Sequence, residues 1–205
     1  MKAINHDRTG RLNRRRLVQG ALISMGTFGF VPSSGEELKR TPRDFTGPFY
    51  PVGERNRSND LIKGTPQFDV LNLRGKVIDL VKTPIKNVIV DIWHADPNGR
   101  YKHPRDRGQN DLLDEFLYSG TATTNENGEF DFRTYIPGSY RARPANHIHY
   151  KVWKANEELL TSQIYFDKFG GDQGMSRSRS KAELQTISLV EIEPANYEST
   201  LTVVI

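Results

Sequence analysis

Two of the five histidines of this chain lie one residue apart, in the stretch Arg141-Ala142-Arg143-Pro144-Ala145-Asn146-His147-Ile148-His149-Tyr150. Side chains two residues apart in a β-strand point to the same face of the sheet. His147 and His149 would therefore share one face, while Ile148 turns to the other. Neutral imidazole is the commonest metal ligand among side chains, so the pair predicts half of a metal site. A surface strand that carries two histidines without a metal is the alternative that the pair alone leaves open.

Composition limits the kinds of protein this chain can be. Its 205 residues, 36% of them hydrophobic, are enough to bury the core of one domain. The chain has no cysteine, which excludes disulfides, thiolate metal sites and cysteine nucleophiles. The net charge of +4 comes from residues 1–33, which hold six of the 29 basic residues and one of the 25 acidic residues. The remainder has 23 basic and 24 acidic residues, so binding to nucleic acid has no electrostatic support.

Residues 1–33 have the pattern of an export signal. The basic group Arg14-Arg15-Arg16 precedes an uncharged run over residues 20–31, and small residues suited to cleavage follow. The run is too short and too rich in glycine for a membrane span, and the paired arginines resemble a twin-arginine signal. We expect an exported protein, periplasmic or extracellular, with no membrane span after processing. An ordinary basic N-terminus, and hence a cytoplasmic protein, is the alternative.

The rest of the chain predicts an arm followed by a β domain. Residues 34–66 are polar and rich in proline and glycine, which indicates an extended N-terminal arm. Residues 67–205 form the predicted domain, with short apolar or alternating segments separated by turns such as Asn127-Gly128. This spacing predicts an all-β fold, either a sandwich or a barrel. We expect a sandwich of mixed or antiparallel sheets with long active-site loops and little helix. The segment 70–80 is expected to form one strand, or two divided at Gly75. Further strands are expected within residues 88–93, 121–124, 130–134, 147–153, 159–166, 186–192 and 201–205.

Two tyrosines follow turn glycines and are candidate partners of the histidines. They occur in Gly99-Arg100-Tyr101 and in Pro137-Gly138-Ser139-Tyr140. A phenol has an ordinary pKa of about 10, but a bound cation can remove its proton and make it an anionic ligand. The sequence has neither the His-Glu-x-x-His motif of zinc hydrolases nor the pattern of a two-histidine, one-carboxylate Fe(II) site. Tyrosinate pairs favour Fe(III). Each tyrosine taken alone is better explained as an aromatic residue at a turn, and only the combination of the four residues favours a metal site.

Read in order, several segments resemble the intradiol ring-cleavage dioxygenases, a family of non-haem Fe(III) enzymes. The resemblance covers about residues 41–166 and rests most strongly on the combination of Pro-Gly-x-Tyr with His-Ile-His. The segments that carry it are Gly47-Pro-Phe-Tyr50, Leu73-Arg-Gly75-Lys-Val77, Val90-Asp-Ile92-Trp93, Asp96-Pro-Asn-Gly99-Arg-Tyr101, Thr121-Ala-Thr123, Asn127-Gly-Glu-Phe130, Thr134-Tyr-Ile-Pro-Gly138-Ser-Tyr140, Arg143-Pro-Ala-Asn-His147-Ile-His149 and Leu160-Thr-Ser-Gln163-Ile-Tyr-Phe166.

The resemblance implies an iron site and a reaction. Tyr101, Tyr140, His147 and His149 would bind non-haem Fe(III), and Tyr140 would leave the metal to act as a base. The substrates would be a small catechol-type molecule and O2. The catechol ring would open between its two hydroxylated carbons, and both oxygen atoms of O2 would enter the product. Iron would act as a Lewis acid.

Two further residues have implied catalytic roles. Arg143 would stabilise negative charge on the ring, and Gln163 would help to orient the substrate. One residue more than the family pattern separates Arg143-Pro144 from His147, which leaves Arg141 as the alternative.

Several points stay open at the level of sequence. The competing hypotheses are an exported β-sandwich binding module and an iron-binding relative without turnover. The identity of the catechol, a homo- or hetero-oligomeric state and the cleavage site of the signal are not determined. The candidates for pairing with a substrate carboxylate are the cations near Tyr101, namely Arg100, Lys102, Arg105 and Arg107.

Overall fold

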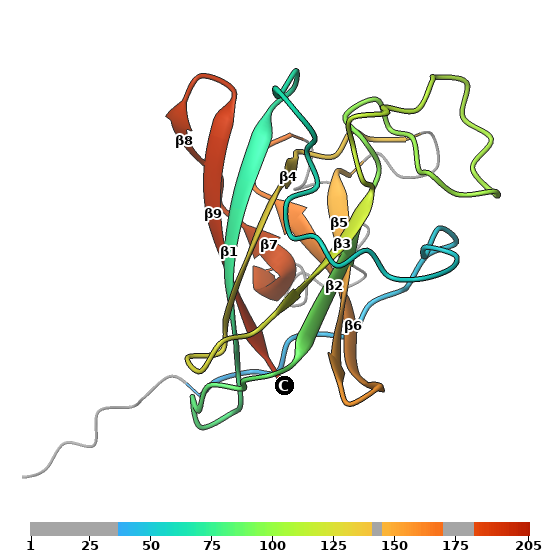
Figure 1. Ribbon diagram of the computed structural model, residues 1–205. Coiled ribbons are helices and arrows are strands. Elements are labelled where there is room, and N and C mark those ends of the chain that lie inside the picture. The colour runs from blue at the N-terminus through green and yellow to red at the C-terminus, as the bar shows by residue number, and fades with distance from the viewer. Residues whose placement is uncertain (1–36, 141–144, 170–182) are drawn as a thin grey trace, which may run out of the picture. The chain divides into compact units, whose positions relative to one another are not determined.

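Nine strands form two layers in the computed structural model, which describes residues 37–140, 145–169 and 183–205 (Figure 1). The strands are β1 (Val70–Ile78), β2 (Ile89–Trp93), β3 (Ser119–Thr123), β4 (Glu129–Tyr135), β5 (His147–Lys154), β6 (Glu157–Phe166), β7 (Thr186–Ile187), β8 (Val190–Glu193) and β9 (Asn196–Val204). Helix is confined, within these residues, to one turn at 183–185. The predicted all-β sandwich with little helix is confirmed.

Each layer is a mixed sheet. The four-stranded sheet has the order β4-β1-β9-β8, with β1 and β9 parallel. The five-stranded sheet has the order β3-β2-β5-β6-β7, with β6 and β7 parallel. The other neighbouring pairs of strands are antiparallel.

The core fills the space between the two sheets. Because side chains alternate along a strand, every second residue of β2, β5 and β1 turns inward. These residues are almost fully buried, and they include Val90, Ile92, Ile148, Val152, Leu71 and Leu73. Gly75, where the sequence left open a break into two strands, lies within the single strand β1. The ring of Phe130 covers it so closely that a Cβ at Gly75 would lie 2.0 Å from Phe130 Cζ.

Two predicted strands at the C-terminal end have different bounds in the structure. The segment predicted as one strand over 186–192 is divided into β7 and β8, which belong to different sheets. The last strand begins at Asn196 rather than at Leu201. Val190 and Ile192 are exposed in β8, so burial of these apolar side chains did not define that segment.

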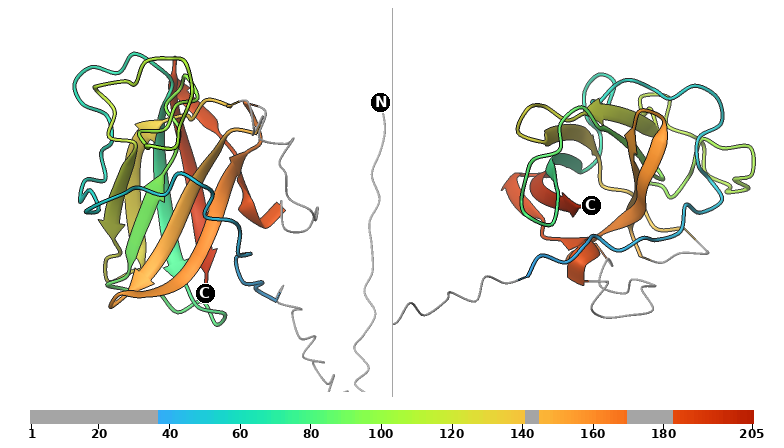
Figure 2. Two further views of the ribbon diagram at one scale, coloured as in Figure 1. Left: turned by 90° about the vertical axis from the view of Figure 1, so that its right-hand side faces the viewer. Right: turned by 90° about the horizontal axis from the view of Figure 1, so that it is seen from below.

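The arm, here the described residues 37–66, crosses the outer face of the five-stranded sheet. Figure 2 shows its first part, in blue, passing over the orange strands β5 and β6. Backbone hydrogen bonds fasten it at both sheets, from Thr41 N–H to Val204 O (2.9 Å) and from Asp44 N–H to Thr161 O (3.0 Å). Apart from isolated bridges at Asp60 and Ile62, the arm has no strand pairing.

Some of the predictions concern residues outside those described. The export signal over residues 1–33 lies there, and the predicted domain boundaries and the exported location stay predictions. Arg141 and Arg143 also lie outside the described ranges. Within those ranges, no helix has the length and apolar character that crossing a membrane requires.

Candidate metal centre

The histidine pair lies on the outer face of the five-stranded sheet, as strand periodicity predicted. His147 and His149 begin β5 with exposures of 3% and 1%, while Ile148 between them enters the core. Strand register aligns His149 with Trp93 of β2 and with Gln163 of β6. The pair therefore belongs to a row of outward side chains that the arm has covered.

The hydrogen bond of His147 fixes which ring nitrogen is available to a metal. Its Nδ1 lies 2.8 Å from the carbonyl oxygen of Ala145, which can only accept a hydrogen bond. In the neutral ring the proton is therefore assigned to Nδ1, and Nε2 carries a lone pair. This Nε2 lies 3.2 Å from Nε2 of His149. Two nitrogens bound at right angles to one ion at about 2.1 Å would lie about 3 Å apart, so the spacing suits a shared metal.

Asp96 organises the turn that carries Tyr101 toward the histidines. Its carboxylate accepts hydrogen bonds from the backbone N–H groups of Asn98 (2.9 Å) and Arg100 (3.0 Å) and from the hydroxyl of Tyr118 (2.8 Å). Its backbone oxygen accepts from Gly99 N–H (2.9 Å). The side chain is fully buried, so these bonds compensate the loss of water around the carboxylate.

The turn at Gly138 packs directly on the turn at Gly99. Gly138 N–H donates to the same backbone oxygen of Asp96, at 3.0 Å. A Cβ at Gly138 would lie 2.1 Å from Pro97 O, and a Cβ at Gly99, where φ is +79°, would lie 2.3 Å from Ser139 O. Only glycine permits this approach, which brings together two tyrosines that are far apart in sequence.

Four rings form a closed circuit at the centre of the site. The centroid distances are 5.5 Å from Tyr101 to Tyr140, 5.9 Å from Tyr140 to His147, 4.7 Å from His147 to His149 and 6.4 Å from His149 to Tyr101. Tyr101 is 3% exposed, whereas Tyr140 is half-buried. The structure thus brings together all four residues that the sequence predicted as ligands.

A hydrogen-bonded carboxylate holds the backbone of Tyr101. Asp106 Oδ2 accepts from Tyr101 N–H (2.7 Å) and from Nε of Arg100 (2.9 Å). Burial alone would raise the pKa of Asp106, but the hydrogen bonds from Arg100, Gly108 and Tyr101 hold it below its ordinary value. Arg100 is therefore engaged as an ion pair. The other three candidate cations for a substrate carboxylate are exposed, namely Lys102, Arg105 and Arg107.

The donor set fits a hard trivalent ion better than the other metals considered. It offers two imidazole nitrogens and two phenol oxygens that become anionic on binding a cation. Among the residues described, no group of three or more His, Cys, Asp or Glu side chains is placed to hold a metal. A tris-histidine zinc site and a two-histidine, one-carboxylate iron site thus have no structural support in this part of the chain.

Gln163 ties the arm to the row of His149. Its Nε2 donates to Phe45 O in the arm (2.8 Å), and its Oε1 accepts from the hydroxyl of Tyr165 (2.9 Å). The side chain is 1% exposed. These contacts assign Gln163 a structural task, and its predicted role in orienting substrate stays a prediction.

Aromatic residues of the arm and of β2 complete the site, and sequence reasoning gave them no role in it. Phe49 lies 4.7 Å from Tyr101 and 6.0 Å from Tyr140 between ring centroids. Trp93 stacks on His149 at 5.0 Å with an interplanar angle of 6°. The available signal was Gly47-Pro48-Phe49-Tyr50, in which two aromatic residues follow a turn within a polar segment.

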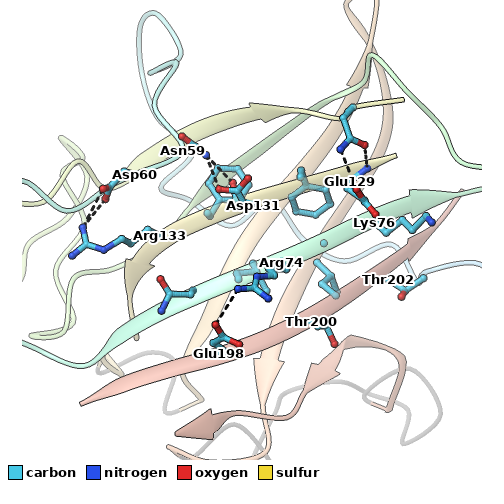
Figure 3. Close-up of a pocket in the computed structure, with 17 residues that line it drawn as sticks. Asn59, Asp60, Arg74, Lys76, Glu129, Asp131, Arg133, Glu198, Thr200 and Thr202 are labelled. Atoms are coloured by element: carbon cyan, nitrogen blue, oxygen red, sulfur yellow. Dashed lines mark hydrogen bonds and ion pairs between the residues drawn. The ribbon is translucent and has the colours of Figure 1, made fainter. Parts of the chain in front are cut away.

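A large groove lies away from the four rings. It has a volume of about 940 Å³ and runs over the outer face of β4, β1 and β9 (Figure 3). Its charged side chains pair with one another, as Arg74 does with Glu198 (3.1 Å) and Arg133 with Asp60 (3.1 Å). None of its lining residues belongs to the four-ring circuit, so the size of this groove does not indicate the site.

Comparisons with known sequences identify relatives of this chain. A profile of a family described as Dioxygenase matches residues 45–177. The chain is 30% identical over 142 residues to the protocatechuate 3,4-dioxygenase beta chain of Burkholderia cepacia, covering 63% of this chain and 60% of that protein. It is 30% identical over 146 residues to catechol 1,2-dioxygenase of Acinetobacter baylyi, covering 60% and 45%. The matched part is therefore less than two thirds of each relative's length.

Solved structures share the fold. One is the dioxygenase domain of a fusion with a carbohydrate-binding protein from Streptomyces sp. SirexAA-E, with a TM-score of 0.61, 25% identity and coverage of 82% of this chain and 98% of that chain. Another is 3-chlorocatechol 1,2-dioxygenase from Rhodococcus opacus, with a TM-score of 0.61, 25% identity and coverage of 80% and 71%.

Proposed function

Because the chain belongs to the intradiol ring-cleavage dioxygenase family, we propose that it is a non-haem Fe(III)-dependent dioxygenase acting on a catechol-type substrate. In this reaction the ring opens between its two hydroxylated carbons, and both atoms of O2 enter the product. The observation that carries the proposal is the closed circuit of Tyr101, Tyr140, His147 and His149.

These four side chains would hold the iron. When bound, Fe(III) supplies a Lewis acid and electron acceptor for the catechol. The assigned tautomer of His147 favours this role, because Nδ1–H is held by the Ala145 carbonyl and Nε2 is left as a donor to the metal.

The two tyrosines have unequal surroundings, which supports unequal roles. Tyr101 is buried, and Asp106 fixes its backbone, so it suits a permanent ligand. Tyr140 is half-buried, and its phenolate oxygen would accept a proton from a catechol hydroxyl. Phe49 and Trp93 would exclude water from the space beside them, which strengthens the electrostatic effect of nearby charges.

The direct test is reconstitution of the full chain with Fe(III), followed by an oxygen-uptake screen with catechol, protocatechuate and hydroxyquinol. The expected results are about one iron per chain, a visible tyrosinate-to-iron band and a ring-opened diacid that carries label from 18O2 in both carboxyl groups. An aldehyde-bearing product would contradict the proposal. Iron and colour without oxygen uptake would favour a relative without turnover, and a colourless protein without iron would favour a binding module.

Exchanging each tyrosine separately tests their roles. Tyr101→Phe removes a permanent anionic ligand, so iron should bind more weakly and the visible band should fade. Tyr140→Phe removes a base, so iron should be retained while the substrate complex forms slowly and kcat falls. Identical behaviour of the two variants would contradict the division of roles.

Arg143 is proposed to stabilise the negative charge that develops on the substrate ring. Removing one well-aimed electrostatic donor lowers kcat by about 10²–10³, so Arg143→Ala should do so with the iron colour intact. Arg141→Ala is the matched variant and should have little effect. The reverse result would assign the role to Arg141.

Location and partners belong to the proposal as well. We propose export through a twin-arginine signal, a small catechol and O2 as partners, and no role in binding nucleic acid. Changing Arg14 and Arg15 to lysine should keep a folded, coloured protein in the cytoplasm. Unaltered export of that variant would remove the twin-arginine assignment.

A further inference from the structure

The ring of His149 is confined on two sides. Trp93 lies against its face, with ring centroids 5.0 Å apart and an interplanar angle of 6°. Gly47 of the arm lies at its edge, where a Cβ would be 3.0 Å from Cε1 of His149. Trp93 of β2 and the path of the arm therefore both constrain the orientation of this imidazole.

Trp93 is in turn supported by the arm. Its side chain is 1% exposed, and Tyr50 meets it edge-on with ring centroids 4.7 Å apart at 86°. Tyr50, Trp93 and His149 thus form a continuous column of three rings, called the ring column below. An edge-on contact followed by a parallel stack fixes the plane of the middle ring, and hence the plane of the last.

A charge cluster around the buried Asp91 anchors the first ring of the column. The hydroxyl of Tyr50 donates to Oδ2 of Asp91 at 2.7 Å, and Asp91 also faces Nε of Arg55 at 3.5 Å. Nζ of Lys151 lies 4.8 Å from the centroid of the Tyr50 ring. Asp91 is 2% exposed and stands two residues before Trp93, on the same face of β2.

The protonation of Tyr50 agrees with this anchoring. Burial, followed by the hydrogen bond to Asp91, raises the pKa of Tyr50 to about 12. The phenol therefore keeps its proton under ordinary conditions and remains a donor to the Asp91 carboxylate.

We propose that Tyr50 is a positioning residue for His149, acting through Trp93, so that docking of the arm and binding of metal at His149 are coupled. The inference rests on the proposed metal site. Neither Tyr50 nor Trp93 belongs to the four-ring circuit; their task is to hold the imidazole plane.

The physical reason lies in the direction of the metal–imidazole bond. The lone pair of Nε2 lies in the ring plane, so a ring that tilts turns the lone pair away from the point shared with His147. Because the ring column fixes the plane of His149 before the metal binds, less side-chain entropy of His149 is lost on metal binding. Coupling is reciprocal, so metal bound at His149 must stabilise the docked arm by the same factor.

The first measurement is iron affinity by competition with a chelator, using full-length variants. Tyr50→Leu removes the edge-on ring, and loss of a side chain that supports a metal ligand lowers metal affinity by about 10–100-fold. Tyr50→Phe keeps the ring and loses only the hydroxyl, so its affinity should lie between Tyr50→Leu and the wild type.

Phe68→Leu is the matched control for loss of an aromatic ring. Phe68 is partly buried and meets Tyr135 edge-on at 5.6 Å and 80°, outside the four-ring circuit. Both leucine variants should lower the thermal midpoint, but only Tyr50→Leu should lower iron affinity. A purely structural role for Tyr50 would give the two variants equal iron affinity.

The second measurement is hydrogen exchange of arm amides, which does not depend on turnover. The N–H groups of Thr41 and Asp44 are bonded across to β9 and β6. Iron should slow their exchange in the wild type and in Phe68→Leu, and this slowing should shrink in Tyr50→Leu by the factor lost in iron affinity.

The outcomes separate this inference from the proposed function. A wild-type protein that binds no iron would refute the proposed metal site itself. A wild type that binds iron and cleaves catechol, together with a Tyr50→Leu variant of unchanged iron affinity and unchanged iron-dependent protection, would overturn the positioning role alone.

Discussion

The outer faces of the two sheets differ in solvent exposure. On the four-stranded sheet, outward side chains such as Arg74, with 70% of its side chain exposed, form ion pairs in an open groove (Figure 3). On the five-stranded sheet, the outward residues His149 and Gln163 are each 1% exposed. The difference is the first part of the arm, which covers the second face, where Phe45 O accepts a hydrogen bond from Gln163. Among the described residues, the arm contacts the first face only near its edge strand β4, at Asn59 and Asp60. The same strand periodicity therefore gives a solvated surface in one sheet and a water-excluded candidate site in the other.

Among the changes considered, removing an imidazole from the covered face should have the largest effect on iron affinity. His147→Ala or His149→Ala should lower iron affinity by more than about 100-fold, because even residues that only support a metal ligand contribute 10–100-fold. The measurements are iron per chain and the visible spectrum. His103→Ala is the control, since His103 contacts Phe49 but lies outside the four-ring circuit. Normal iron content in the double variant of His147 and His149 would contradict the assignment.

Acid should lower the free energy of unfolding, because His94 is buried in the interior of the protein. Its Nε2 lies 2.7 Å from Oγ1 of Thr134 and its Nδ1 lies 2.7 Å from Ala95 O. Burial lowers the pKa of His94 from 6.5 to about 4. Between pH 6.5 and pH 4 the unfolded chain binds a proton at His94 that the folded protein does not bind. The contribution of neutral His94 to the free energy of unfolding is therefore complete above pH 6.5 and is lost as the pH falls toward 4.

The magnitude follows from the two pKa values. Between pH 7.5 and pH 5, this one group should lower the free energy of unfolding by about 2 kcal/mol. Urea unfolding of metal-free wild type and His94→Asn checks it, because the variant should lose that much less over the same pH range. Equal losses in both proteins would show that other groups cause the acid sensitivity.

A smaller change tests whether the arm's closeness matters. Gly47→Ala places a Cβ 3.0 Å from Cε1 of His149, at a position with φ of +72°. Gly64→Ala is matched, with φ of +71° and no atom within 4 Å. Both should lose about 1–2 kcal/mol of stability from the left-handed backbone.

Only Gly47→Ala should also weaken iron binding, on the order of tenfold. Chelator competition and urea unfolding measure the two effects separately. Equal iron affinity of the Gly47 and Gly64 variants would mean that His149 can move away from the added methyl group without weakening metal binding.

The smallest expected effect lies on the open face. A double-mutant cycle of Arg74→Ala and Glu198→Ala should give a coupling of about 0.2–1 kcal/mol, because exposed ion pairs are screened by water and salt. Urea unfolding measures the coupling, and iron content should not change. A loss of iron in these variants would show that the two faces are not independent.

Much of the fold and part of the candidate site follow from local rules of sequence. The period of two in a strand places His147 and His149 on one face, and Asn127-Gly128 forms a turn before β4. Gly99 and Gly138 mark turns that precede Tyr101 and Tyr140 by two residues each. These features are local because they depend on backbone preferences of neighbouring residues.

Other features depended on partners far away in the chain. The residues next to Gly75 in sequence do not predict that the ring of Phe130 packs over this glycine within the unbroken strand β1. Likewise, the division of residues 186–193 between two sheets is set by pairing with β6 and β9 rather than by apolar pattern. Local sequence carries no information about such distances.

The amino-acid sequence by itself determined an all-β chain with two histidines facing one way and two tyrosines after turns. Only the tertiary structure decided that Gly99 and Gly138 pack together, that Asp96 bonds to both turns, and that the arm closes over His149. The physical reason is that strand periodicity sets the direction of a side chain, whereas convergence on one point requires close contacts between segments that the chain itself keeps far apart.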